Sequence, residues 1–367
     1  MTNIFMTNIF NILDYGAIGD GITDCTASIQ KAFDEASLCQ GKIVVPPGKY
    51  CVGKLHMHGQ GVSLVGTSSW SFRSDGSSIF VLNDASVDCM IDITGAFGCA
   101  IRGMSLNGDN LGEMIHGIKL YWDKYNGGSE EDTPTIDDCR IGSFSGDGVH
   151  LEHIWCFSVR HSMLHDNGRA GLFIDGWDGF ILDNWLSCNN GSGILGGGVV
   201  ASITCTGNRV EWNRRGGFII PFGDSYNITG NFFDRSFGPA LELGSKETIG
   251  VSLVTVTGNI FRRSGAHETA FKNPEHCSHV LLTNCSNMVV TGNTMRVGRN
   301  DVGGGVLSPD YGFIIKDCKD CIIKDNTMMT GAIKELIQAS SNQNCIIDDN
   351  IGSLADENTQ MASPLLN

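Results

Sequence analysis

Residues 202–216 read SITCTGNRVEWNRRG, and close variants of this segment recur as NITGNFFDRSFG (227–238), TVTGNIFRRSG (255–265) and MVVTGNTMRVG (288–298). In each copy, two or three apolar residues lead to an Asn, which is followed by an apolar or small residue and a polar turn containing Gly. With spacings of 24, 23, 28, 34, 33 and 24 residues, the repeated Asn falls at Asn184, Asn208, Asn231, Asn259, Asn293, Asn326 and Asn350. Self-similarity at such a period, with insertions in three copies, is typical of a solenoid.

The residues inside each copy indicate which kind of solenoid this is. Val, Ile, Phe and Thr alternate in short runs that Gly and Asn interrupt, without a helical stripe or a recurring Leu frame. We therefore predict an all-β fold, a single parallel β-helix whose coils contribute two or three short strands and stack ~4.8 Å apart.

The repeated Asn has a physical role in this fold. An Asn adopts the left-handed turn conformation at low cost, and its amide can hydrogen-bond from coil to coil. We predict that Asn184, Asn208 and Asn231 stack in one column. Earlier coils keep the apolar frame, and in these the Asn position is assigned to His161, Cys139 and Met104.

The unbroken repeat predicts one β-helix domain over residues 12–353, with an N-terminal extension at 1–11 and a tail at 354–367. The chain has 367 residues and a net charge of −15, which argues against a nucleic-acid partner. No apolar run approaches the ~20 residues of a membrane span. Fourteen Cys without a disulfide spacing are interpreted as buried free thiols, and the lone pair Cys318 and Cys321 supports zinc only weakly.

The first ten residues, MTNIFMTNIF, lack the basic region of a signal peptide. This favours a cytoplasmic protein, or one that is associated with a virion or exported by a non-classical route.

Residues 12–50 contain D-Y-G-A-x-G-D-G-x-x-D, then an amphipathic segment, and then V-x-P-x-G-x-Y. The amphipathic segment predicts a capping helix at about 25–38. With the Asn coils, residues 12–50 resemble the pectate-lyase-like superfamily. The resemblance covers almost the whole chain and implies a right-handed parallel β-helix of the kind found in polysaccharide lyases, glycoside hydrolases and phage tailspikes. It is specific for the fold and not for the reaction. Residues 308–326, SPDYGFIIKDCKDCIIKDN, also resemble inulin-fructotransferase-like β-helices.

The family's polygalacturonase-type hydrolases carry N-T-D, D-D, G-H-G and R-I-K motifs. This chain matches only at Asp137-Asp138 and at Gly117-Ile118-Lys119, and it has neither N-T-D nor G-H-G. Pectate lyases in the superfamily use calcium and an Arg base, and Arg262 and Arg263 are candidates for that base.

The first candidate site follows from the repeat register. Three residues after each Asn come Ser187, Glu211, Asp234, Arg262, Arg296 and Met329, and alternation places this position outward. Glu211 and Asp234 would then be neighbours about 5 Å apart, as a glycosidase acid and nucleophile require. Glu242 is the wider-spaced alternative partner of Asp234, and Arg262 would hold the charged carboxylate.

Trp212 beside Glu211 is predicted to form a sugar platform, with Arg235 and Arg263 contacting substrate. The alternative interpretation is a solvated ladder of opposite charges that stabilises stacked coils.

A second candidate site offers a His–Asp pair for lyase or epimerase chemistry. Its residues are His161, His165, Asp166, Asp175, Trp177, Asp178 and Trp185.

We therefore predict a carbohydrate-active enzyme that acts on a polysaccharide or oligosaccharide with paired carboxylates, as a glycoside hydrolase or a fructotransferase-like enzyme. The alternatives are a polyuronate lyase or epimerase, and a non-catalytic glycan-binding or tailspike module. No cofactor is expected, apart from calcium if the protein is a lyase. The superfamily resemblance also implies a homotrimer, with Phe173, Leu195 and Ile219 as an outward apolar patch.

Overall fold

The computed structural model describes residues 8–67, 70–124, 130–266, 273–299, 305–356 and 358–359. The chain divides into two compact units, residues 1–190 and 191–367, which are described separately here. Most of the predicted extension at 1–11, most of the tail at 354–367 and parts of the two longest insertions lie outside the described residues. The assignment of residues 12–353 to one domain stays a prediction.

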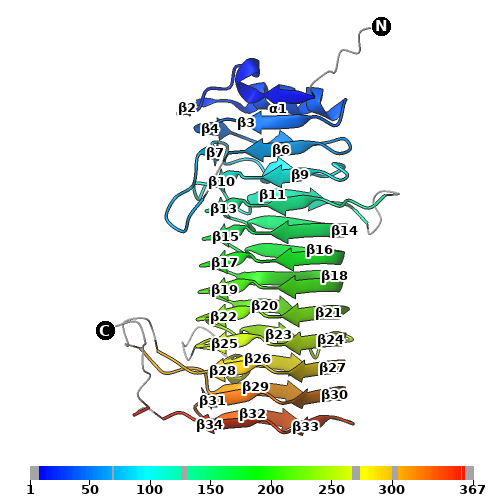
Figure 1. The fold of residues 1–367 in the computed structure, drawn as a ribbon, viewed down its shortest axis with the longest axis vertical. Helices are drawn as coiled ribbons and strands as arrows, with labels where there is room; N and C mark the ends of the chain where they lie inside the picture. The colour runs from blue at the N-terminus through cyan, green and yellow to red at the C-terminus, as the bar shows by residue number, and fades with distance from the viewer. Residues whose placement is uncertain are drawn as a thin grey trace. The chain divides into compact units, whose positions relative to one another are not determined.

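The first unit is a stack of coils in which every pairing between named strands is parallel (Figure 1). We call the two sets of strands sheet A and sheet B. Sheet A comprises β1 (Ile9–Asn11), β3 (Lys42–Val45), β5 (Leu55–His56), β6 (Ser63–Gly66), β8 (Cys89–Asp92), β9 (Ala100–Arg102), β11 (His116–Tyr121), β12 (Thr135–Asp137), β14 (Val149–Arg160) and β16 (Leu172–Leu182). Sheet B comprises β2 (Asp20–Asp24), β4 (Gly48–Val52), β7 (Ser78–Leu82), β10 (Ser105–Asn107), β13 (Arg140–Gly142), β15 (Met163–His165) and β17 (Trp185–Ser187).

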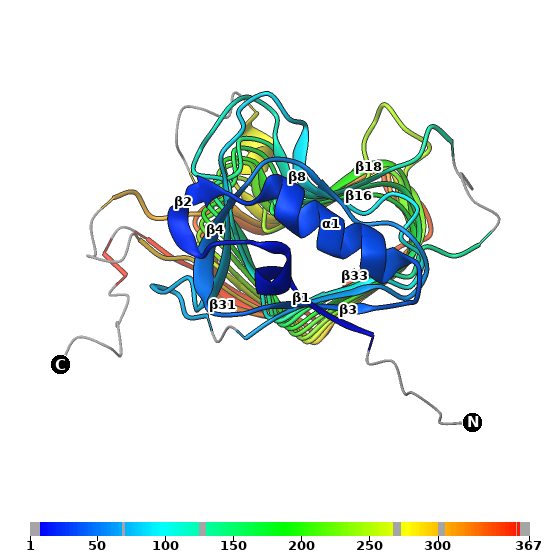
Figure 2. The ribbon, with the colours of Figure 1, turned by 90° about the horizontal axis from the view of Figure 1, so that it is seen from above.

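The predicted capping helix is confirmed as α1 (Thr26–Ser37), which follows the short 3-10 helix η1 (Ile12–Tyr15). Its buried face is Ile29, Ala32, Phe33 and Ala36, and it contacts β1, β3 and β5. Seen along the stack of the first unit, α1 lies across the end of the coils (Figure 2). The helix therefore covers apolar side chains that the first coil would otherwise expose to water.

The second unit repeats the same arrangement with parallel pairings. Its sheet A comprises β18 (Ser192–Thr206), β20 (Gly216–Ile220), β21 (Gly223–Thr229), β23 (Leu241–Leu243), β24 (Val251–Thr257), β26 (Ser278–Thr283), β27 (Cys285–Thr291), β29 (Tyr311–Lys316), β30 (Lys319–Lys324), β32 (Glu335–Ser340) and β33 (Ile346–Asp348), with the 3-10 helix η2 (Pro274–His276) before β26. Its sheet B comprises β19 (Arg209–Glu211), β22 (Phe232–Asp234), β25 (Ile260–Arg262), β28 (Thr294–Arg296), β31 (Thr327–Ala332) and β34 (Ile351–Leu354). Inward residues of sheet B stack between coils, as Phe233 does on Phe261 with ring centroids 5.1 Å apart.

The Asn column is confirmed within the second unit. The backbone N–H of Asn208 donates to Oδ1 of Asn231 at 3.0 Å, and the same bond links each further Asn to the next as far as Asn350. Asn184 belongs to the first unit, where its Oδ1 accepts from the backbone N–H of Ser162 at 3.1 Å. Buried backbone groups must be paired, so this ladder satisfies N–H groups that the turn leaves without a strand partner.

Two details of the predicted column are wrong. The left-handed residue of each turn is the one before the Asn, such as Gly207, Gly230 or Asp325, so the Asn itself supplies hydrogen bonds and not the unusual backbone. In the first unit, Ser162 and not His161 occupies the position that Asn holds in later coils. The backbone N–H of Trp185, the residue after Asn184, donates to the carbonyl of Ser162. In the same way, the N–H of Met163, the residue after Ser162, donates to the carbonyl of Cys139. His161 lies one residue earlier and is exposed, since a shift of one residue along a strand reverses the side chain's face.

A second amide contact occurs five residues further on in the first unit. Asn167 donates through its backbone N–H and its Nδ2 to Oδ1 of Asn189, at 3.2 and 3.0 Å. Both residues are buried. The spacing N-x4-N at Asn184 and Asn189 is visible in the sequence and could have indicated this contact.

The prediction of free thiols is confirmed, since all fourteen cysteines are free and nine are buried.

The predicted apolar patch of Phe173, Leu195 and Ile219 is only partly confirmed. Leu195 and Ile219 are register partners on β18 and β20, but Ile219 is 5% exposed and so cannot form an exposed patch. Phe173 belongs to the first unit and stacks against His150. The homotrimer stays a prediction.

No helix in the described part of the chain is long and apolar enough to cross a membrane.

The buried His279 of β26 predicts a pH-dependent stability. Burial lowers its pKa from 6.5 to about 3, although a hydrogen bond with the Arg296 backbone acts in the opposite direction. Between these two values the unfolded chain binds a proton that the folded chain does not. His279 should therefore reduce the free energy of unfolding by up to roughly 1.4 kcal/mol for each pH unit below 6.5.

Urea unfolding followed from pH 7 to pH 4 measures this dependence. His279→Leu should flatten the slope by one proton, whereas Val280→Ala, which removes core volume beside it, should lower stability equally at every pH. An unchanged slope in His279→Leu would exclude this account.

Candidate functional site

The predicted register around Asp234 is confirmed, but its exposure is not. Glu211, Asp234 and Arg262 are successive partners on β19, β22 and β25. Glu211 is only 4% exposed and Asp234 only 1%, so the prediction that they face solvent is wrong. Arg263, which follows β25, binds Asp234 through two bonds, Nε to Oδ1 at 3.1 Å and Nη2 to Oδ2 at 2.9 Å. Arg263, and not Arg262, therefore holds this carboxylate.

The other members of this first candidate site are also engaged within the protein. Nη1 of Arg235 donates to Oδ2 of Asp234 at 2.6 Å, and its guanidinium lies 4.6 Å from the Trp212 ring centre. That cation covers one face of the ring, and the sugar platform stays a prediction. Glu211 accepts from Arg209 at 2.9 Å. Burial raises the pKa of the Asp234 carboxyl, and the charges of Arg263 and Arg262 act in the opposite direction.

Glu242 is not brought to Asp234. It lies on β23 of sheet A, whereas Asp234 lies on β22 of sheet B. Its carboxylate contacts Nη1 of Arg215 at 3.2 Å and Nε2 of His276 at 3.8 Å. The first candidate site is thus a set of separate ion pairs, which favours the charge-ladder interpretation, although here the charges are mostly buried.

The second candidate site is divided between the sheets. Asp175 and Trp177 lie on β16 of sheet A, where Trp177 pairs with Trp155 of β14. His165 lies on β15 of sheet B, next to Gly142, and its Nδ1 contacts Asp166 at 2.7 Å. A Cβ at Gly142 would come within 2.4 Å of His165 Nε2, so the glycine makes room for the imidazole. Of the predicted residues on β16, Asp175 is the register partner of Glu152 on β14.

The structure brings together a His–Asp cluster in the first unit that the sequence did not reveal. Oδ2 of Asp147 lies 2.8 Å from Nδ1 of His150 and 3.3 Å from Nδ1 of His116. Its Oδ1 accepts from the Ala170 N–H at 2.8 Å, and Nη1 of Arg169 lies 3.6 Å from Oδ2. Asp147 is completely buried, so the carboxylate orients both imidazoles without contacting solvent.

The cluster continues to the surface along β14. Nε2 of His150 lies 3.0 Å from Oε2 of Glu152, whose side chain is 31% exposed. Lys119 and Phe173 are the register partners of His150 on the two neighbouring strands, and Tyr121 and Asp175 are those of Glu152. The Phe173 ring stacks on the imidazole at 4.4 Å. A histidine linked to a carboxylate at each nitrogen therefore stands between a cationic and an aromatic side chain.

The electrostatics of the cluster follow from its contacts. Burial by itself raises the pKa of Asp147, but hydrogen bonds with His116 and His150 and the charge of Arg169 outweigh it and lower the pKa below the usual value. Burial lowers the pKa of His116, against the effect of its hydrogen bond with Asp147. The buried carboxylate thus stays ionised and fixes the orientation of His150.

His116, Asp147 and His150 also form a possible metal-ligand set, because their ligand atoms lie within 4.8 Å of one another. However, two of the three groups are imidazoles, which are poor ligands for calcium because this cation prefers oxygen. The three residues therefore do not fit calcium. The prediction of no required cofactor remains a prediction.

The sequence carried a weak signal for this cluster. Residues 147–153 read DGVHLEH, and β-alternation places His150 and Glu152 on one face. The segment has no Asn-aligned counterpart, and His116 lies 31 residues before Asp147. Only the stacking of β11 on β14 brings them together.

The comparisons with known proteins agree with this fold. The sequence pattern of the rhamnogalacturonase A/epimerase, pectate lyase-like family matches residues 9–218, and that of a right-handed β-helix region matches residues 192–358. These matches confirm the predicted superfamily and the right-handed parallel β-helix.

Two curated relatives come from Azotobacter vinelandii. Mannuronan C5-epimerase AlgE3 is 28% identical over 232 residues, which is 60% of this chain and 12% of that protein. Alginate lyase 7 is 28% identical over 193 residues, 50% of this chain and 22% of that protein. The chain thus spans less than a quarter of the length of either.

Among solved structures, DFA-IIIase from Arthrobacter chlorophenolicus A6 has a TM-score of 0.62 at 14% identity, covering 98% of this chain and 90% of that one. At this identity the likeness shows the fold alone.

Proposed function

The chain belongs to the rhamnogalacturonase A/epimerase, pectate lyase-like family, and from this membership we propose that it is a carbohydrate-active enzyme that epimerises or cleaves a polyuronate at the His150 cluster. The single observation that carries the proposal is the line of contacts from buried Asp147 through His150 to the half-exposed Glu152. The similarity to mannuronan C5-epimerases and to an alginate lyase supports a uronate substrate.

The cluster suits removal of the C5 proton of a uronate. This proton is next to a carboxylate, and its loss leaves an electron pair delocalised into that carboxylate, which a nearby cation stabilises. The His150–Glu152 pair takes the proton, and Asp147 holds His150 in the orientation that this transfer requires. Lys119, the register partner of His150, and Arg169 supply positive charge for the substrate carboxylate.

Two outcomes follow from the same intermediate. A proton returned to the opposite face of C5 gives the epimer, and Tyr121 lies exposed in the same row as a candidate donor. Alternatively, the C4–O bond breaks, the electron pair forms a C4–C5 double bond, and the leaving oxygen takes a proton. The first outcome is epimerisation and the second is β-elimination.

A second candidate is a retaining glycoside hydrolase, because Glu152 and Asp175 are direct register partners on β14 and β16. Neighbouring strands lie ~4.8 Å apart, which is close to the ~5 Å carboxyl separation of retaining enzymes.

A product assay with polymannuronate in deuterated water distinguishes these functions. For an epimerase our proposal predicts a product with inverted C5 that carries deuterium at C5. For a lyase it predicts an ultraviolet-absorbing end with a C4–C5 double bond, whose C5 carries no hydrogen. New reducing ends without C5 deuterium or this absorbance would instead support the hydrolase. Retention of glycan without any product would favour a non-catalytic binding module.

A further inference from the structure

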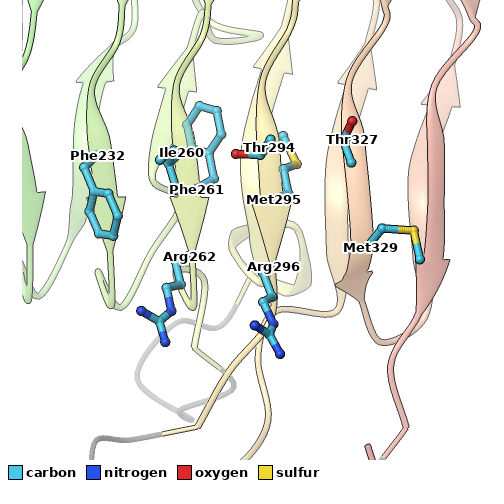
Figure 3. A pocket seen from close by; sticks show the side chains of 9 residues that line it. All are labelled: Phe232, Ile260, Phe261, Arg262, Thr294, Met295, Arg296, Thr327 and Met329. Atoms are coloured by element: carbon cyan, nitrogen blue, oxygen red, sulfur yellow. The ribbon is translucent and has the colours of Figure 1, made fainter. Parts of the chain in front are cut away.

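A basic surface lies on sheet B of the second unit, on the strands that follow Asp234, whose register partner on β25 is Arg262. A hollow of about 380 Å³ opens over β25, β28 and β31. We call it the arginine pocket, and its lining is Phe232, Ile260, Phe261, Arg262, Thr294, Met295, Arg296, Thr327 and Met329. Figure 3 shows the side chains of Arg262 and Arg296 side by side, extending in the same direction from neighbouring strands.

The two arginines are held at the spacing of successive coils. Arg262 and Arg296 are direct register partners on β25 and β28, so their Cα atoms lie about one strand spacing, ~4.8 Å, apart. Like charges this close repel one another, so placing two arginines on neighbouring strands does not stabilise the fold. An anion placed against both guanidinium groups removes the repulsion.

The charge of Arg262 is not neutralised locally. Asp234 is its partner on β22, but that carboxylate already binds Arg263 and Arg235. Arg262 has no ion-pair partner among the residues that the structure describes. In a chain with a net charge of −15, this is a local excess of positive charge.

The rest of the lining is apolar or carries hydroxyl groups. Ile260 is 44% exposed and Met329 57%, and Phe232 is the register partner of Ile260 on β22. Thr294 and Thr327 follow in the same row and offer hydroxyls. An apolar shelf with hydroxyls and two guanidinium groups suits a sugar ring, whose C–H face packs on apolar side chains while its carboxylate binds arginine in a bidentate manner.

We infer that the arginine pocket is a second glycan-binding site, which takes an acidic saccharide through Arg262 and Arg296. Its occupant is a uronate-containing chain, chosen over a neutral glycan because of the paired arginines. The substrate class rests on the proposed function, but the pocket contains none of the proposed catalytic residues. Binding can therefore be measured whether or not the protein turns the saccharide over.

Calorimetric titration with a short oligomannuronate tests the inference, using His150→Gln protein to prevent turnover. We expect two binding sites per chain in this protein and one after Arg262→Ala with Arg296→Ala. If the His150 cluster binds no uronate, the same substitutions should reduce the count from one site to none. Failure of the proposed function is thus distinguishable from failure of the second site.

Conservative and control variants sharpen the result. Arg262→Lys with Arg296→Lys keeps the charge but loses bidentate contacts, so affinity at this site should fall about tenfold while its salt dependence remains. Lys246→Ala removes an exposed cation elsewhere in the same unit and should change neither. A neutral glucan oligomer of equal length should not bind at this pocket.

Unchanged stoichiometry and affinity in a folded Arg262→Ala, Arg296→Ala protein would overturn the inference. So would a change of oligomeric state, measured by light scattering, without any loss of saccharide binding. The latter result would identify this face as an interface with a second copy of the chain.

Discussion

His150→Gln should lower turnover of polymannuronate by about 10²–10⁴-fold, because it breaks the His150–Glu152 pair that accepts the C5 proton. The side chain is buried between Asp147 and Glu152, and Gln preserves hydrogen-bonding capacity at a similar volume. The fold should therefore survive, as judged by circular dichroism and by the midpoint of thermal unfolding. The measurement is the initial rate of C5 deuterium incorporation in deuterated water for an epimerase, or of the rise in ultraviolet absorbance for a lyase.

His161→Gln is the matched control for this prediction. His161 also lies beside a carboxylate, with Nδ1 at 3.2 Å from Asp137, but it is exposed and lies at a turn of the first unit, outside the cluster. We expect normal turnover. If His161→Gln loses activity and His150→Gln retains it, the second site predicted from the sequence becomes the active site, and the proposed assignment of the base is wrong.

Glu152→Gln separates the two members of the pair. If Glu152 is the group nearest the substrate, its loss should lower turnover as strongly as that of His150. A much smaller effect would indicate that the imidazole reaches the substrate directly after Glu152 moves aside.

Asp234→Ala should lower the free energy of unfolding by about 3–5 kcal/mol, the cost of breaking a buried ion pair by removing one partner. Arg263, only 8% exposed, would lose both of its carboxylate bonds, and Arg235 would lose one. Urea unfolding measures the change. Lys324→Ala is the control, because its partner Asp325 is more than half exposed and such surface pairs contribute at most about 1 kcal/mol.

The same substitution distinguishes a structural Asp234 from the catalytic one that the sequence suggested. A stable Asp234→Ala protein without turnover would restore the catalytic interpretation. Replacing both partners, as in Asp234→Leu with Arg263→Met, should recover part of the lost stability, because no buried charge is then left unpaired.

Local sequence patterns were sufficient to predict the fold, the capping helix and the register of the second unit. These features depend on local periodicity: apolar alternation decides which residues face inward, and the repeated Asn marks the same turn in every coil. The partners Glu211, Asp234 and Arg262 follow directly from that alignment. In the coil of His161 the repeated Asn is absent. The alignment of that coil was therefore wrong by one residue, and it placed the His161 side chain on the wrong face of the strand.

The contacts between polar residues, and their burial, could be seen only in the three-dimensional arrangement of the coils. Alternation places Asp234 outward from its strand, but it cannot show that Arg263 and Arg235 from the following turns close over the carboxylate. The His150 cluster combines Asp147 from a turn with His116 from the preceding coil, residues that share no repeat position. Hydrogen bonding and desolvation depend on distances in three dimensions, and stacking sets those distances between coils of unequal length.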